Sequence, residues 1–280
     1  MKLGLSSLLF PKDPIERAIE ISADLGFECV ELVHDMPHFS PHHDTEQLKR
    51  LRELMDSHGL EALIHACLWD LNPMSHYPVL RELTTAGTKR GIDACHILGG
   101  KIVTIHPGRC QFEESREHFE RAKGWFRAYV RECLDYAEER GVILAIETIP
   151  FSTNYPRTTE ELVEIVEDFD GLGITLDVGH SYLAAKKDQE TDPEGSIIGS
   201  IEKIRKYLVN IHLHDNWGIR DEHLAPGKGT IDLQRIVGAL RSSNYSGPII
   251  LELWNPADPI KTANEALRYV RTKLRLGPSA

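Results

Sequence analysis

Cysteine is scarce in this sequence and forms no recognisable metal-binding or redox motif. Five cysteines are scattered through 280 residues, and no two of them stand in a Cys-x-x-Cys pair. An odd, unpatterned set without a signal peptide is typical of a reducing compartment, so we expect a cytoplasmic protein with mostly buried thiols. No apolar run is long enough to cross a membrane, so we expect no membrane-spanning segment.

An excess of positive charge is also missing. The chain has 32 Lys and Arg residues against 43 Asp and Glu residues, for a formal net charge of −11. Proteins that bind a nucleic acid backbone usually carry a basic surface, so this charge lowers the expectation of a nucleic acid partner. The first apolar segment is followed by "SSLLFPKD", without a glycine-rich phosphate loop. That absence disfavours a doubly wound nucleotide-binding sheet.

Short apolar segments alternate with amphipathic ones along the whole chain. The segments span residues 2–7, 29–33, 62–67, 101–106, 142–147, 173–178, 209–214 and 248–253. Residues 44–59, from Asp44 to Gly59, carry the start and stop signals of an amphipathic helix, and another helix is expected to start at Thr158 or Thr159. Eight strand-then-helix units without a linker predict an α/β protein, a single (β/α)8 TIM barrel domain over residues 1–280.

The predicted strands bring His, Asp and Glu residues to their carboxyl ends. These residues are Glu31, His65, His106, Glu147, Asp177, His212, His214 and Glu252, with His180 just after Asp177. In a TIM barrel those ends meet at one rim, where active sites lie. Clustered carboxylates would repel one another unless a cation lay among them, so we predict a divalent metal. Mixed imidazole and carboxylate ligands suit Zn, Mn, Co or Fe, and Glu31 is as well placed to cap the rim as to line the pocket.

The segment after the seventh strand carries a further pair of candidate ligands. Asp221 and His223 stand two residues apart in "RDEHLAPGKGTID", a spacing that lets both side chains bind one metal. Gly227 and Gly229 follow and would allow the backbone to turn closely beside the site.

Together these residues resemble the xylose-isomerase-like TIM barrels, which include sugar and sugar-phosphate isomerases and epimerases and the endonuclease IV enzymes. The resemblance covers nearly the whole chain, in "HPG" at 106–108, "ET" at 147–148, "LDVGH" at 176–180, "HLHDN" at 212–216, "RDEHLAPGKGTID" at 220–232 and "LELW" at 251–254. In the isomerase and epimerase branch, the resemblance implies one metal held by Glu147, Asp177, His212 and Glu252. His212 rather than His214 is chosen because it stands three residues before Asp215.

The endonuclease branch implies three zinc ions. The first would be held by His65, His106 and Glu147, the second by Glu147, Asp177, His212 and Glu252, and the third by His180, Asp221 and His223. The segments after the second and third strands, "HDMPHFSPHHD" and "LWDLNPMSHYP", contain no Lys or Arg. That composition suits a small ligand better than a DNA duplex.

The sequence therefore favours a metal-dependent isomerase or epimerase acting on a sugar or sugar phosphate. A bound Mn, Co or Zn ion would stabilise an enediolate, and Glu147 and Glu252 would act as acid and base. The expected substrate contacts are His180, His214, Arg220 and Trp254, and the resemblance also implies a homodimer. The alternatives are an endonuclease IV-like phosphodiesterase acting on abasic DNA with Fe or several Zn ions, a polyol dehydratase, and a barrel that only binds a sugar.

Overall fold

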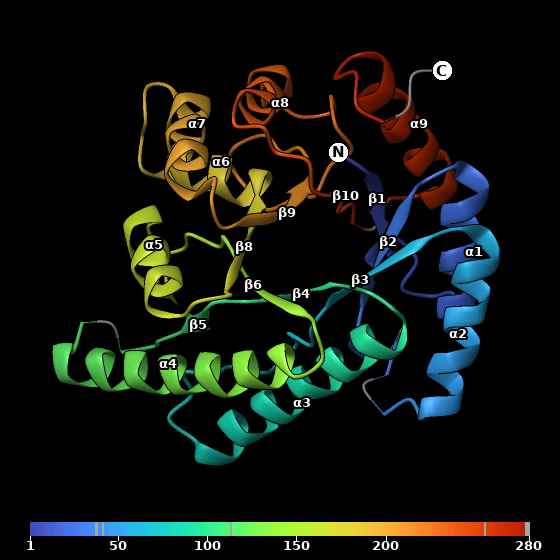
Figure 1. The fold of residues 1–280 in the computed structure, drawn as a ribbon. Coiled ribbons are helices and arrows are strands. Elements are labelled where there is room, and N and C mark those ends of the chain that lie inside the picture. Colours follow the sequence, from blue (N-terminus) through green and yellow to red (C-terminus); the bar gives the residue numbers. More distant parts are fainter. Residues whose placement is uncertain (37–38, 41, 113, 255, 278–280) are drawn as a thin grey trace.

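The computed structural model describes residues 1–36, 39–40, 42–112, 114–254 and 256–277, and these form a closed barrel of eight parallel strands inside a ring of helices (Figure 1). The strands are β1 (Leu3–Ser6), β2 (Cys29–Val33), β3 (Glu61–His65), β4 (Ile102–Ile105), β6 (Ile143–Glu147), β8 (Gly173–Asp177), β9 (Leu208–Leu213) and β10 (Ile249–Leu251). Around the barrel the order is β1-β10-β9-β8-β6-β4-β3-β2. The predicted TIM barrel and its eight strands are confirmed.

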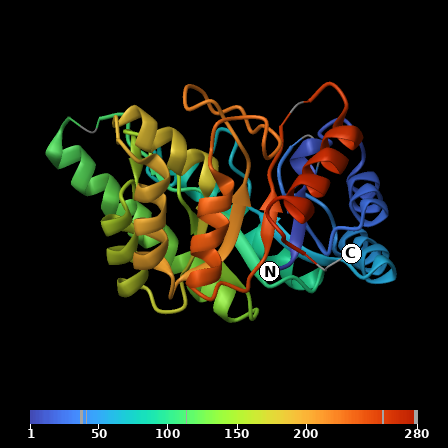
Figure 2. The same cartoon turned by 90° about the horizontal axis from the view of Figure 1, so that it is seen from above.

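Helices cover the outside of the barrel, as the view from above shows (Figure 2). They are α1 (Ile15–Leu25), α2 (Thr45–His58), α3 (Pro78–Ile97), α4 (Arg116–Glu138), α5 (Thr159–Asp168), α6 (Val178–Lys187), α7 (Pro193–Ile204), α8 (Leu233–Ser242) and α9 (Pro259–Thr272), with a short 3-10 helix η1 (Ser7–Leu9). Asp44 begins α2 through a capping box and Gly59 ends it in the left-handed conformation, as predicted. Thr158 is the N-cap of α5.

Two features of the fold escape the sequence pattern. Apart from Ile92, the buried residues of helix α3 are small, and Gly91 lies close to Ile64 and Ala66, so the apolar periodicity that reveals a helix is weak there. Strands β5 (Gly108–Arg109) and β7 (Asn154–Tyr155) form a separate antiparallel pair. They follow β4 and β6 and join the two segments that leave those strands.

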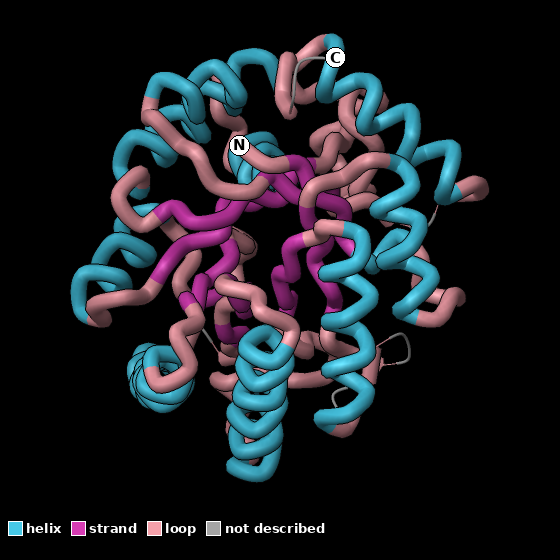
Figure 3. The backbone as a smooth tube through the Cα atoms, turned by 45° about the vertical axis from the view of Figure 1, so that its right-hand side comes forward, coloured by secondary structure: helices cyan, strands magenta, loops and turns pink. Residues whose placement is uncertain are grey.

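The strands surround the interior of the barrel (Figure 3). Because side chains alternate along each strand, those that point inward form layers. An apolar layer consists of Cys29, Leu63, Ile102, Ala145 and Ile250. Two residues further along the same strands, the side chains are Glu31, His65, Thr104, Glu147 and Glu252, all of them buried. A buried polar layer therefore packs directly against an apolar layer, and the polar layer lies at the carboxyl ends of the strands.

The remaining core lies between the barrel and its helices. The five cysteines are free, and all but Cys67 are buried. Among the residues described, no helix has both the length and the apolar character needed to cross a membrane.

Candidate metal centre

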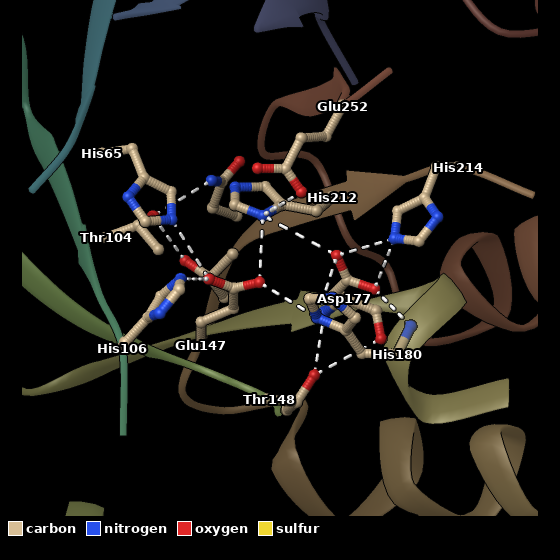
Figure 4. Close-up of polar contacts among 12 residues, drawn as sticks. His65, Thr104, His106, Glu147, Thr148, Asp177, His180, His212, His214 and Glu252 are labelled. Carbon is tan, nitrogen blue, oxygen red and sulfur yellow. Dashed lines mark hydrogen bonds and ion pairs between the residues drawn. The ribbon is translucent and has the colours of Figure 1, made fainter. Parts of the chain in front are cut away.

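Glu147, the last residue of β6, lies at the centre of the polar layer among four imidazoles (Figure 4). Its Oε2 atom is 3.2 Å from His65 Nε2 and 3.1 Å from His106 Nε2. Its Oε1 atom is 3.3 Å from His180 Nδ1 and 3.5 Å from His212 Nδ1. The two oxygens of this one buried carboxylate therefore face two different groups of imidazoles.

The central set of donors consists of Glu147, Asp177, His212 and Glu252, each offering one atom within 4.8 Å of the others. His212 Nδ1 lies 3.5 Å from Glu252 Oε2 and 3.9 Å from Asp177 Oδ2. Both His212 Nδ1 and Glu252 Oε2 are buried without a hydrogen-bond partner. Burying such atoms unpaired is costly, and a divalent cation among them would satisfy both. The structure thus brings together the four residues predicted for one metal. Their imidazole and carboxylate donor atoms lie close enough together to bind a single divalent ion.

A first flanking set consists of His65, His106 and Glu147. The His65 Nδ1 atom lies 3.0 Å from the Ala66 carbonyl oxygen, to which its N–H donates. In neutral His65, Nε2 is then unprotonated and faces an oxygen of Glu147, so a proton or cation is needed between them. The His65 and His106 rings are nearly perpendicular, at 83°, so their nitrogen lone pairs can converge on one ion.

A second flanking set joins the segment after β9 to the barrel. Asp221 Oδ2 is 3.0 Å from His180 Nε2, and Asp221 Oδ1 is 3.3 Å from His223 Nε2. The Nδ1 atom of His223 is 3.0 Å from the carbonyl oxygen of Glu252, which leaves Nε2 as the atom facing Asp221. The structure therefore also assembles the three residues predicted for a third ion, and Asp221 Oδ1 is a buried atom without a hydrogen bond.

His214 lies beside this second flanking set but does not share its geometry. Its ring stacks on His223 with centroids 3.8 Å apart and an interplanar angle of 13°. Lone pairs in two nearly parallel ring planes cannot both point at one ion, although distance alone places His214 in the set. Its Nε2 atom instead lies 3.1 Å from Asp177 Oδ1. His214 therefore supports a carboxylate of the central set.

Asp177 has a second partner because it is also the N-cap of α6. Its Oδ1 atom accepts the backbone N–H of His180 at 2.6 Å. Helix α6 starts at the next residue, so the cap places His180 against both Asp177 and Glu147. A strand-end carboxylate here serves the helix with one oxygen and faces the central set with the other.

Asp215 shapes the segment that carries Asp221 and His223. This fully buried carboxylate accepts backbone N–H bonds from Gly227 at 3.0 Å and Gly229 at 2.9 Å, and others from Asn216 and Ile231. A side chain on Gly229 would collide with Asp215 and with the Asn216 carbonyl. The close turn expected at the two glycines is confirmed, and it folds the segment back over the barrel.

Strong mutual interactions shift the titration of these groups. Burial would lower the pKa of His65, but its hydrogen bond to Glu147 raises that pKa to about 9. Burial would raise the pKa of Glu147, but neighbouring imidazoles, His106 first, hold it well below its ordinary value. The pKa of His223 is raised to about 9 against the effect of burial, mainly by Asp221. The directions of these shifts favour imidazolium ions opposite the buried carboxylates when no metal is bound.

The rim above the centre contains a pair of tryptophans. Trp69 and Trp254 are 42% and 43% exposed, and their ring centroids lie 6.2 Å apart. The Trp254 ring also meets His223 edge to face. Sequence reasoning placed Trp254 at the site but did not propose Trp69, whose only signal was an aromatic residue after the third strand. Arg220 is exposed, and its role as a substrate contact remains a prediction.

Comparison with known proteins agrees with this geometry. The family model "Xylose isomerase-like TIM barrel" matches residues 19–273. The uncharacterized protein MJ1311 of Methanocaldococcus jannaschii is 31% identical over 274 residues, covering 96% of this chain and 89% of that protein. The crystal structure of a D-tagatose 3-epimerase-like protein is also 31% identical, with a TM-score of 0.80 over 98% of this chain and 100% of the other. The fructoselysine 3-epimerase of Shigella flexneri is 20% identical, with 98% of both chains covered.

Proposed function

The chain belongs to the xylose isomerase-like TIM barrel family, and from that premise we propose that it is a metal-dependent isomerase or epimerase of a sugar. The observation that carries the proposal is the central set, in which Glu147 and Glu252 lie on either side of His212 Nδ1, each at 3.5 Å. Isomerases and epimerases of this kind need two groups that exchange a proton at carbon, together with an electrophile for the adjacent carbonyl.

Glu147, Asp177, His212 and Glu252 would hold the ion, with Mn, Co or Zn suited to this mixture of imidazole and carboxylate donors. A divalent ion there would polarise the substrate carbonyl and stabilise the enediolate formed when the neighbouring C–H bond is deprotonated. Glu147 is the last residue of β6 and Glu252 follows β10, and β8 and β9 lie between these two strands in the barrel. One would remove the proton and the other would return one to the opposite face of the carbon, which inverts its configuration.

The rim suits a sugar ring, with or without a phosphate. Of the two cations after β9 that could contact a phosphate, Arg220 is exposed and Lys228 is paired with Glu265 at 3.3 Å. Trp69 and Trp254 offer half-exposed aromatic faces, with Trp254 beside His223, and such faces suit the C–H groups of a sugar. His180, which lies beside Glu147, would contact the substrate, whereas the fully buried His214, also predicted as a substrate contact, would instead support Asp177. The names of the relatives, an epimerase and an epimerase-like protein, agree with a sugar substrate.

A specific observation favours a second candidate, a multinuclear phosphodiesterase related to endonuclease IV. Donors for three ions lie around Glu147, since the two flanking sets complement the central one. Several zinc ions can activate water and stabilise both oxygens of a phosphodiester displacement. The net charge of −11 disfavours a DNA duplex as the substrate.

The experiment begins with the metal content of protein purified without added metal. About one equivalent of Mn, Co or Zn supports the central set alone, whereas two or three equivalents of Zn or Fe direct the assays to abasic DNA and other phosphodiesters first. Ketoses are then incubated with the loaded enzyme in D2O, and deuterium entry at carbon is followed by NMR. We expect Glu147→Gln and Glu252→Gln to reduce exchange by at least about 100-fold, the usual scale for a lost acid or base.

The control is Glu194→Gln, which alters a buried carboxylate outside the barrel, where it accepts the backbone N–H of Asp232. It should exchange like the wild type. If either Glu147→Gln or Glu252→Gln keeps full exchange activity while folded, the acid–base assignment is wrong. If no ketose exchanges but abasic DNA is cleaved, the second candidate replaces the first.

A further inference from the structure

Glu31 is a buried carboxylate that neither candidate reaction uses. It lies in the middle of β2, is fully buried, and belongs to the polar layer inside the barrel. The sequence left open whether it lines the pocket or caps the rim, and the structure places it inside the barrel. A carboxylate in such a position is costly unless its oxygens are paired.

Glu31 contacts the Nε2 atom of His212, whereas the Nδ1 atom of the same ring faces the central set. His212 Nε2 lies 3.0 Å from Glu31 Oε1 and 3.2 Å from Glu31 Oε2, and His212 is itself fully buried. The Asn210 side-chain amide donates to Glu31 Oε2 at 3.1 Å, while the Oδ1 atom of Asn210 has no hydrogen-bond partner. Both side chains that donate to Glu31 Oε2, those of His212 and Asn210, lie on β9. The shortest contact of the Glu31 carboxylate is with the imidazole.

This contact decides which nitrogen of His212 is available. Glu31 already accepts a hydrogen bond from the side-chain amide of Asn210, so it acts as an acceptor, and the proton between it and His212 is assigned to Nε2. In the neutral ring Nδ1 is then unprotonated, and Nδ1 is the atom that faces Glu147, Asp177 and Glu252. A negative charge beyond Nε2 also makes Nδ1 a stronger electron donor.

We propose that Glu31 is a positioning residue, which holds His212 in the tautomer and orientation that present Nδ1 to a divalent ion. The proposal rests on the central set as a metal site but not on the identity of the substrate. Outer partners of metal-bound histidines typically contribute about 10- to 100-fold to metal affinity.

The test is zinc affinity, measured by titrating metal-free protein against a competing chelator. In Glu31→Leu the acceptor is gone, and we expect zinc affinity at the central set to fall by about 100-fold. In Glu31→Gln the amide oxygen can still accept from His212 while the amide N–H donates to a flipped Asn210, so we expect a loss of only about 10-fold. Glu194→Gln, the buried carboxylate outside the barrel, should bind zinc like the wild type.

A double-mutant comparison separates positioning from a general structural effect. If Glu31 acts through His212, adding Glu31→Leu to a His212→Gln protein should weaken zinc binding no further. Additive losses would mean that Glu31 acts by another route, and the proposal would be wrong. The proposal would also be wrong if folded Glu31→Leu lost less than about 10-fold in zinc affinity. If Glu31→Leu does not fold, a loss of less than about threefold in Glu31→Gln would overturn the proposal instead.

A nitrogen-resolved NMR spectrum of the zinc-loaded protein gives a second readout. The His212 signals, assigned by their absence in His212→Gln, should show a proton on Nε2, and a proton on Nδ1 would overturn the proposal. These measurements need no substrate. An absence of sugar activity would therefore refute the proposed function without touching the role of Glu31, whereas failure of the central set to bind zinc would refute both.

Discussion

Metal binding to this protein should release protons in a number that identifies which donor sets are used. An imidazole must be neutral to bind a metal, yet the pKa values of His65 and His223 are raised to about 9. The pKa values of His180 and His212 are raised well above 6.5 by neighbouring carboxylates that outweigh burial. At pH 7.5 a group with a pKa of about 9 is roughly 97% protonated, so each of these ligands gives up about one proton.

The expected count differs between the two candidate functions. An ion in the central set binds one imidazole, His212, and so displaces about one ligand proton. Its binding to Glu147 also weakens the hold of that carboxylate on the protons of His65 and His180. Ions in all three sets displace about four, from His65, His180, His212 and His223. His106 adds none because burial, against the effect of Glu147, lowers its pKa. Each released proton makes the apparent affinity rise about tenfold per pH unit, or about 1.4 kcal/mol.

The assay is calorimetric titration of zinc into metal-free protein, in two non-phosphate buffers with different ionisation enthalpies. The difference in observed heat gives the protons released per zinc. Binding without proton release, or an affinity that stays flat between pH 6.5 and 8.5, would refute the view that imidazolium ions occupy the metal sets.

The same shifts make a prediction about stability. Because the folded pKa values of His65 and His223 are raised from 6.5 to about 9, their contribution to stability is fully present below pH 6.5. It is lost as the pH rises through 9, so the melting temperature of metal-free protein should fall over that interval. Zinc-loaded protein should not follow this fall, because its metal takes the place of those protons.

Two further predictions concern the surroundings of the centre. A Cβ atom at Gly179 would collide with the ring of the fully buried His214, so Gly179→Ala should lower the melting temperature and zinc content together. Unchanged values of both would contradict the packing described. If a sugar stacks on the rim, Trp69→Ala and Trp254→Ala should each raise KM by about 3- to 10-fold with little change in kcat, in steady-state assays on the active ketose. A fall in kcat with unchanged KM would instead place these rings at the reacting atoms.

Much of the fold could be predicted because its signals are local. Asp44, Thr158 and Gly59 mark helix ends through contacts within a few residues, and the structure confirms all three. Helix α3 gave a weak signal because the packing of Gly91 against Ile64 and Ala66 is a property of two elements far apart in sequence. The β5–β7 pair is hidden for the same reason, since two residues per strand leave no periodicity to detect.

Most of the candidate ligands were also visible in the sequence, because they stand at or next to the carboxyl end of a strand and all such ends meet at one rim. Sequence could not assign His214, however. Its spacing from His212 places both on one face, but only the stacking on His223 and the contact with Asp177 distinguish it from a ligand. Nor could it choose a role for Glu31, whose partner lies on β9, 181 residues away along the chain.

The sequence by itself therefore determined the barrel, the strand ends and the chemical types gathered there, because apolar periodicity and helix caps act over short distances. The tertiary structure alone decided which atoms face one another. Glu147 presents one oxygen to His65 and His106 and the other to His180 and His212, and Glu31 leaves His212 with Nδ1 free. Such pairings depend on ring orientation and strand register across a closed barrel, which arise only when all eight strands have packed together.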